Sequence, residues 1–263
     1  MKTNQDKKIR GTGGLGPLLA ALALVGGCTG PGFAPAIAPR VVAEGPAASV
    51  VLPGQYRIVG RSVEGRPILI RVVGEGKEVT FILAGIHGDE RAGTSLVRRL
   101  AGYLDDHSDR VRDKTILLLP LANPDARAKE TRENARSVDV NRNFPADNRV
   151  AAPQSGPWAL SEPESRAIYR ILREYRPERV VSLHQPLGCV DYDGPAEELA
   201  GRMSGACGLP VRQLGARPGS LGSYLSQVRG VPIITLELLE SDSGLSEDEL
   251  WSRYGAALLV AVE

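Results

Sequence analysis

Residues 78–90 read EVTFILAGIHGDE, an apolar run that passes abruptly into a polar segment. The apolar part, Glu78–Ala84, is typical of a strand that is buried on both faces of a parallel sheet. Gly85–Glu90 is the predicted loop after this strand. Apolar residues then recur at helical spacing, at Leu96, Val97, Leu100 and Leu104. A strand, a polar loop and an amphipathic helix in this order predict one β–loop–α unit.

Similar apolar strands recur along the chain. They are predicted at Thr115–Leu119, at Val180–Leu183 before His184, and at Val231–Leu236 before Glu237, with a hairpin from Tyr56–Val59 and Pro67–Val73. Helices are predicted after the capping-box pattern Ser161-Glu162-Pro163-Glu164, over Ala196–Ser204, and after Ser246-x-x-Glu249. Strands that alternate with helices predict a single α/β domain with a mixed, largely parallel twisted sheet flanked by helices.

Polar residues stand at the ends of three predicted strands. His87 and Glu90 follow the first, His184 follows the second, and Glu237 follows the third. In open α/β sheets, sites form beyond the carboxyl ends of the strands. Two histidines and one glutamate are a common ligand set for catalytic zinc. We therefore expect His87, Glu90 and His184 to bind one Zn²⁺ per chain, although H-x-x-E alone also fits a salt-bridged surface histidine.

The segment between residues 123 and 160 is polar and lacks periodicity, which is typical of a functional loop. It contains Arg132 and the run Asp139-Val140-Asn141-Arg142-Asn143-Phe144-Pro145. The ordered series H-x-x-E, Arg, Asn-Arg, His and Glu resembles the zinc carboxypeptidase family. The resemblance spans about residues 55–260 and implies that family's α/β fold.

This resemblance implies a role for each residue of the series. The zinc-bound water would attack the scissile carbonyl, and Glu237 would be the general base. Arg132 would stabilise the oxyanion of the tetrahedral intermediate. Asn141 and Arg142 would bind a free carboxylate of the substrate. Asp139 would orient the first histidine ligand through its second ring nitrogen.

Four further stretches are similar to the murein peptide amidase branch of the family: residues 62–68, 123–125, 187–194 and 218–224. This likeness implies hydrolysis of the amide between γ-D-glutamate and meso-diaminopimelate in peptidoglycan-derived peptides, with a muropeptide that bears a free carboxylate as substrate. Many family members carry a tyrosine just before the Gly-Ser of the last stretch. Leu214–Pro218 contains none, which leaves Arg217 as a candidate substrate contact.

Two other functions remain open from the sequence. One is a general metallocarboxypeptidase that removes C-terminal residues from α-peptides. The other is an inactive, envelope-anchored homologue that binds peptides, against which the retained Glu237 argues. A formal net charge of +1 gives no basic field of the kind that binds nucleic acid.

The N-terminal region has the pattern of an export signal. Basic residues precede the short apolar core Leu18–Val25, and Gly26-Gly27-Cys28 follows. Residues 1–27 are predicted to be a lipoprotein-type signal peptide, with Cys28 as the lipidated residue and membrane anchor; a plain signal peptide is the alternative. The Gly/Pro/Ala-rich residues 28–49 are a predicted tether before the catalytic domain, residues 50–263. Together they predict a periplasm-facing lipoprotein of a bacterial cell envelope.

Cys189 and Cys207 are the remaining cysteines. In an oxidising compartment they could form a disulfide, and two unpaired thiols are the equal alternative.

Overall fold

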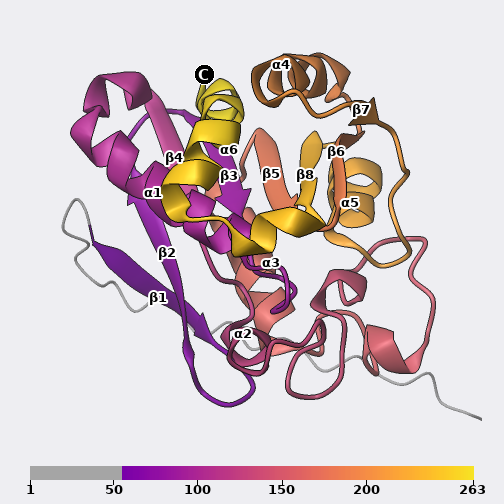
Figure 1. Ribbon diagram of the computed structural model, residues 1–263. Coiled ribbons are helices and arrows are strands. Elements are labelled where there is room, and N and C mark those ends of the chain that lie inside the picture. Colours follow the sequence, from indigo (N-terminus) through magenta and orange to yellow (C-terminus); the bar gives the residue numbers. More distant parts are fainter. Residues whose placement is uncertain (1–54) are drawn as a thin grey trace, which may run out of the picture. The chain divides into compact units, whose positions relative to one another are not determined.

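The centre of the fold is an eight-stranded sheet in the order β1-β2-β4-β3-β5-β8-β6-β7 (Figure 1). The computed structural model describes residues 55–263, so the predicted signal, Cys28 and the tether lie outside the described residues. The strands are β1 (Tyr56–Arg61), β2 (Pro67–Val73), β3 (Glu78–Leu83), β4 (Lys114–Leu119), β5 (Arg179–His184), β6 (Leu187–Asp193), β7 (Val211–Arg212) and β8 (Ile233–Leu239). The central pairs β4–β3, β3–β5 and β5–β8 are parallel, whereas β1–β2, β2–β4 and β6–β8 are antiparallel. The predicted mixed sheet with a parallel centre is confirmed.

Helices cover both faces of this sheet. On one face α6 (Glu247–Val262) contacts both α1 (Ala92–Asp106) and α4 (Glu197–Cys207), as Figure 1 shows. On the other face α3 (Pro163–Tyr175) packs against β1. The short helical segments are α2 (Pro124–Lys129), α5 (Leu221–Ser223), a π turn (Tyr224–Arg229) and 3-10 turns at Ser108–Val111, Val140–Arg142, Pro153–Ser155 and Glu240–Gly244. Among residues 55–263, no helix combines the length and apolarity that a membrane crossing requires.

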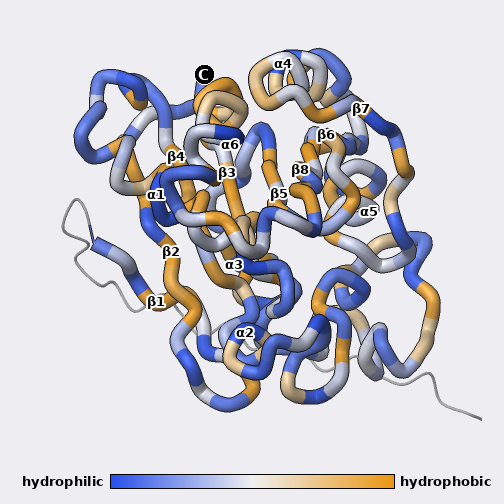
Figure 2. Tube along the Cα trace, in the orientation of Figure 1, coloured by the Kyte–Doolittle hydropathy of each residue, from blue (hydrophilic) through white to orange (hydrophobic). Residues whose placement is uncertain are grey.

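Two apolar cores lie on the two sides of the sheet. One packs the apolar sides of α1, α4 and α6 against strand residues such as Ile82, Val190 and Leu236. The other contains Phe81 and Ile168 and lies on the side of α3. Figure 2 shows the apolar colour along the central strands and the polar colour in the loops around α2. The rigid sheet between these cores fixes the strand ends that carry the predicted site.

The predicted capping box at the start of α3 is wrong. Glu162, not Ser161, is the N-cap of this helix, and its side chain caps no helical N–H. Glu164 does not reach back to Ser161, because its carboxylate accepts hydrogen bonds from Val63 N and Asn134 Nδ2. The second predicted box, Ser246 with Glu249, is present at the start of α6.

The sequence pattern also misplaced the end of one strand and missed β6 and the two-residue β7. β8 continues to Leu239, so Glu237 projects from the body of the strand rather than following it. The next strand in space, β6, was not predicted, although it pairs with β8 over most of its length. Both differences matter because the neighbouring strands β5, β8 and β6 carry residues of the site.

Side-chain alternation places polar groups of these three strands on one face. Val190 and Leu236 point into the core beneath α1, α4 and α6. Since successive side chains of a strand point to opposite faces, their strand neighbours point the other way. We call this the site face; it carries Ser182 and His184 from β5, Thr235 and Glu237 from β8, and Cys189, Asp191 and Asp193 from β6.

Cys189 and Cys207 are free thiols in the structure, so the disulfide alternative does not hold. Cys189 is opposite Glu237 in the β6–β8 register and belongs to the site face. Cys207 ends α4 and packs against the core on the other side of the sheet. The sheet itself therefore separates the two sulfur atoms.

Candidate metal centre and its cavity

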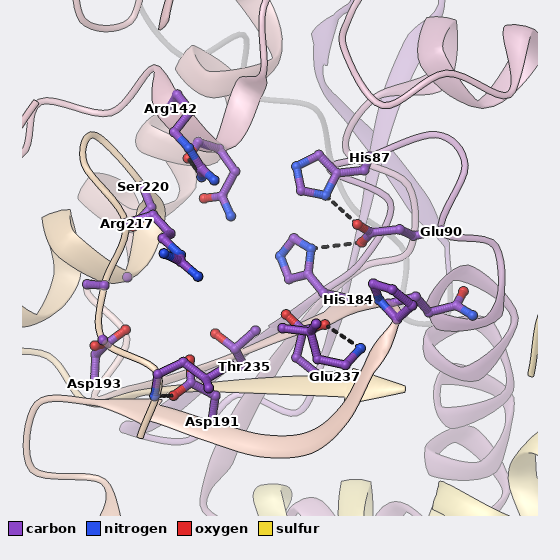
Figure 3. Close-up of a pocket in the computed structure, with 18 of the residues that line it drawn as sticks. His87, Glu90, Arg142, His184, Asp191, Asp193, Arg217, Ser220, Thr235 and Glu237 are labelled. Carbon is purple, nitrogen blue, oxygen red and sulfur yellow. Dashed lines mark hydrogen bonds and ion pairs between the residues drawn. The ribbon is translucent and has the colours of Figure 1, made fainter. Parts of the chain in front are cut away.

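Three side chains converge where β3 and β5 end. His87 and Glu90 lie on the loop between β3 and α1, and His184 is the last residue of β5. Glu90 Oε1 lies 2.6 Å from His87 Nδ1, and Glu90 Oε2 lies 2.8 Å from His184 Nδ1 (Figure 3). All three residues are buried, and their candidate ligand atoms lie within 4.8 Å of one another. The structure thus brings the three predicted ligands together.

The outward ring nitrogens of both histidines have partners of their own. His87 Nε2 is 3.1 Å from Asp139 Oδ1, and His184 Nε2 is 3.0 Å from Ser182 Oγ. A partner on Nε2 fixes the ring and leaves Nδ1 for a metal, which is the usual support for a histidine ligand. The donor set of two Nδ1 atoms and one carboxylate, each with its support, fits a catalytic zinc ion.

Electrostatics within this cluster are strong. Burial alone would lower the pKa of His87, but hydrogen bonds with Asp139 and Glu90 raise it to about 9. Burial would raise the pKa of Glu90, yet the neighbouring His184 and His87 hold it at about 2. Asp139 also has a lowered pKa, because its hydrogen bond with His87 and the charges of Arg132 and Arg142 outweigh its burial. The carboxylates are thus kept ionised, as metal binding requires, whereas a metal ion has to displace the proton that these carboxylates favour on His87.

Asp139 connects the metal ligands to the predicted substrate-binding loop. Its Oδ1 accepts from Asn141 N at 2.8 Å in addition to contacting His87, and so caps the 3-10 turn Val140–Arg142. Its Oδ2 lies 3.2 Å from Arg132 Nε. Arg132 Nη1 also lies 3.4 Å from Glu90 Oε1. One carboxylate therefore sets the positions of a ligand, of Arg132 and of the Asn141-Arg142 pair.

Asn141 and Arg142 face the cavity beside the metal ligands. Asn141 Oδ1 accepts from Leu221 N at 2.9 Å, which directs its Nδ2 donors away from that contact. Arg142 donates from Nη1 to Asn141 O at 2.7 Å, and burial lowers its pKa. A guanidinium and an amide donor on one wall have the chemistry that suits a carboxylate.

Glu237 lies on the site face next to His184, its partner in the β5–β8 register. Its carboxylate is half-buried and lines the same cavity (Figure 3). Burial raises the pKa of Glu237, and the negative charge of Glu90 adds to this. A carboxylate with a raised pKa next to a metal site has the properties of a general base.

Gln185, which sequence reasoning missed, ties three backbone segments of the centre together. Its buried amide accepts from Ala92 N at 3.1 Å and donates to Leu239 O at 2.9 Å. These atoms are two residues beyond Glu90 and two residues beyond Glu237, and Gln185 itself follows His184. Neither its type nor its spacing marks it as functional in the sequence.

The far end of the cavity carries Arg217, the candidate substrate contact, and two acidic residues that were not among the predicted site residues. Asp191 and Asp193 reach it from β6, and Arg217 enters it from the segment before α5 (Figure 3). Burial and the neighbouring Asp191 raise the pKa of Asp193 to about 6. A Cβ atom on Gly222 would lie 2.6 Å from Asp193 Oδ2, so a larger residue there would push this carboxylate out of its position. The alternation Asp-Tyr-Asp was the available signal, had β6 been predicted.

The complete cavity has a volume of about 260 Å³ and joins the metal centre to this acidic end. The predicted residues His87, Glu90, Arg132, Asn141, Arg142, His184 and Glu237 all line it. Asp139 lies behind its wall. The residues that the family resemblance selected over a span of about 150 positions thus form one site.

Comparison with known proteins agrees with this geometry. The family model described as zinc carboxypeptidase matches residues 54–189. Murein peptide amidase A of Escherichia coli strain K12 is 33% identical over 214 residues, which cover 74% of this chain and 84% of the relative.

Solved structures show the same likeness. A murein-tripeptide amidase of Escherichia coli O157 matches with a TM-score of 0.65 and 28% identity over 81% of this chain and 94% of the other. A carboxypeptidase A of Helicoverpa armigera has a TM-score of 0.67 with 20% identity over 79% of this chain and 68% of the other, a likeness of fold.

Proposed function

Because the chain belongs to the zinc carboxypeptidase family and its zinc-binding His87, Glu90 and His184 are in place, we propose that it hydrolyses the amide between γ-D-glutamate and meso-diaminopimelate in peptidoglycan-derived peptides. One observation carries the proposal. The cavity leads from the metal ligands, past the carboxylate-binding pair Asn141 and Arg142, to the acidic pair of β6. This order suits a product residue that has a free carboxylate and a side-chain amine.

One zinc ion per chain fits the single cluster of ligands found among the described residues. When bound, zinc polarises a carbonyl oxygen and makes water more acidic. Glu237 takes the proton of the attacking water and passes it to the leaving amine. Its raised pKa suits both steps, since the carboxyl group must accept and then release a proton near neutral pH.

Two arginines each interact with a different negative charge of the substrate. Arg132 is held next to Glu90 and stabilises the oxyanion that develops on the scissile carbonyl. Arg142 and Asn141 bind the free carboxylate of the leaving residue, which fixes the distance from this carboxylate to the bond that is cut. Asp139 fixes the relative positions of these groups through its contacts with His87, Arg132 and Asn141.

Two observations support a peptidoglycan-derived substrate over an ordinary α-peptide. The Escherichia coli relative is named for murein peptides and covers most of the chain. The cavity ends on Asp191 and Asp193, which suit an amine rather than an apolar side chain. Diaminopimelate is a residue that has a side-chain amine as well as an α-carboxylate. A general metallocarboxypeptidase acting on α-peptides is the second candidate, because it uses the same metal and carboxylate groups.

A substrate series tests the proposal. The full chain, loaded with zinc, is incubated with L-Ala-γ-D-Glu-meso-diaminopimelate and with a blocked α-dipeptide, and the products are identified by mass. We expect free diaminopimelate from the first substrate and little turnover of the second. Turnover of the α-dipeptide alone would establish the general carboxypeptidase instead. Zinc binding without turnover of any peptide would favour a binding homologue.

We also propose that the chain is a lipoprotein of the cell envelope, on the pattern of residues 1–28 alone. A peptidase exposed there would meet wall-derived peptides directly. Fatty-acid labelling of the full chain and of Cys28→Ser tests this. We expect label only on the unsubstituted protein. A processed but unlabelled protein would instead indicate a plain signal peptide.

A further inference from the structure

Arg217 projects into the cavity from a fixed piece of backbone. Its carbonyl oxygen accepts hydrogen bonds from Ser220 N at 3.0 Å and from Ser223 Oγ at 2.7 Å. Its guanidinium points into the open space between Arg142 and Asp193 (Figure 3). Within residues 55–263 this guanidinium forms no salt bridge, whereas Arg132 is paired with Asp139 and Glu90. Its backbone is thus anchored while its side chain is exposed, so the positive charge is available to a ligand.

The charges around Arg217 define what that ligand can be. The positive charge of Arg217 acts on Arg142 on one side and on Asp191 on the other, so the guanidinium lies between the carboxylate-binding pair and the acidic end. A purely cationic side chain would be attracted by Asp193 but repelled by Arg217. A purely anionic side chain would be attracted by Arg217 but repelled by Asp193. A side chain that ends in both an ammonium and a carboxylate satisfies both groups.

We propose that Arg217 determines specificity by binding a second carboxylate at the end of the leaving residue's side chain, while Asp193 receives the ammonium beside it. Arg142 and Asn141 keep the α-carboxylate. The ligand class is therefore a diamino dicarboxylic acid, in contrast to lysine or arginine. This inference rests on the proposed hydrolytic function, and it adds the residue that separates diaminopimelate from lysine.

The experiment compares two substrates that differ in one carboxylate. Full-length protein and Arg217→Gln are assayed on L-Ala-γ-D-Glu-meso-diaminopimelate and on L-Ala-γ-D-Glu-L-Lys. We expect Arg217→Gln to lower kcat/KM for the first substrate about 10- to 100-fold, mostly through KM, since a charge-assisted hydrogen-bond pair is lost. For the lysine peptide we expect kcat/KM to rise about threefold, because a like charge is removed.

Arg212→Gln is the matched control, since Arg212 is an exposed arginine on the neighbouring β7 that does not line the cavity. It should change neither substrate's kcat/KM by more than about twofold, as expected for a screened surface charge. Equal losses on both substrates with Arg217→Gln would overturn the inference, because they would place Arg217 on the shared α-carboxylate. No loss on either substrate would overturn it as well.

Failure of the proposed function gives a different result. The unsubstituted protein would then cleave neither γ-linked peptide and yet cleave α-linked ones. In that case the assay is repeated with α-linked peptides that end in diaminopimelate or in lysine. A diaminopimelate preference that depends on Arg217 would then support the inference and reject only the γ-linkage. A preference that does not depend on Arg217 would reject the inference.

Discussion

The two ends of the cavity differ in how their charged groups are paired. At the metal end, His87, Glu90 and His184 are buried and hydrogen-bonded to one another. At the far end, Arg217 has no salt bridge among the described residues, and Asp191 and Asp193 repel each other. The metal end has its charges balanced before a substrate arrives. The charges of the far end lack partners until a ligand with matching charges binds. Changes at the metal end should therefore affect kcat and metal binding, and changes at the far end should affect KM and the choice of substrate.

The largest effect is expected for Glu237→Gln. Loss of the proposed general base should lower kcat about 10³-fold, because proton transfer by a positioned side chain contributes roughly 10²- to 10⁴-fold. Zinc should remain bound, since Glu237 is not a ligand; metal analysis beside the kinetics checks this. Glu240→Gln, at an exposed position just after β8, is the control. Unchanged activity in Glu237→Gln would remove the residue from catalysis.

Arg142→Met should come next. It removes the guanidinium that we propose binds the α-carboxylate, and we expect kcat/KM to fall about 100-fold for every substrate with that group, as for a lost charge-assisted pair. A matched substrate with an amidated C-terminus should lose less than about threefold. Equal losses on the acid and the amide would mean that Arg142 serves the fold instead.

Asp139→Asn tests whether the carboxylate beside His87 supports metal binding. Removing the charge that faces His87 Nε2 should weaken zinc binding about 10- to 100-fold, as for other outer partners of metal ligands. Competition with a chelator measures the zinc affinity, and Asp147→Asn on an exposed loop position is the control. An unchanged affinity would show that the ring of His87 is held by packing alone.

The smallest effect concerns pH at the far end. The pKa of Asp193 is raised to about 6, so its carboxylate is ionised above that pH and becomes protonated below it. Attraction for an ammonium is therefore present above about pH 6 and is lost as the pH falls. KM for the diaminopimelate peptide should rise about threefold between pH 7 and pH 5 and level off once Asp193 is protonated, because only one ionic contact is lost. Asp193→Asn should abolish this rise, while Asp191 and Arg217 remain as the charged neighbours.

The metal end could be predicted from sequence because its residues follow apolar strands and belong to a family pattern. His87 follows β3 and His184 ends β5, and these two strands are parallel neighbours at the centre of the sheet. The far end could not be predicted in the same way. Asp191 and Asp193 face the cavity only because β6 pairs with β8 in an antiparallel register that no local pattern specifies.

The cysteines show the same limit. Cys189 and Cys207 could pair in an oxidising compartment as far as the sequence shows, yet the sheet lies between them. Glu237 was placed at a strand end because the apolar run stops before it, while its backbone continues in β8 for two more residues. Sequence reasoning supplied the chemistry of the site, and the pairing of the strands determined which side chains share a face.

The buried amide of Gln185 has a consequence for local opening of the protein. A helix normally leaves its first N–H groups without a partner inside the helix, and such protons exchange quickly with solvent. Here the Ala92 N–H at the start of α1 is bound by Gln185, which is also bound to the end of β8. This proton should therefore exchange slowly, at the rate at which α1, β5 and β8 separate together. Its exchange in heavy water would give a measure of how long the assembled centre stays closed.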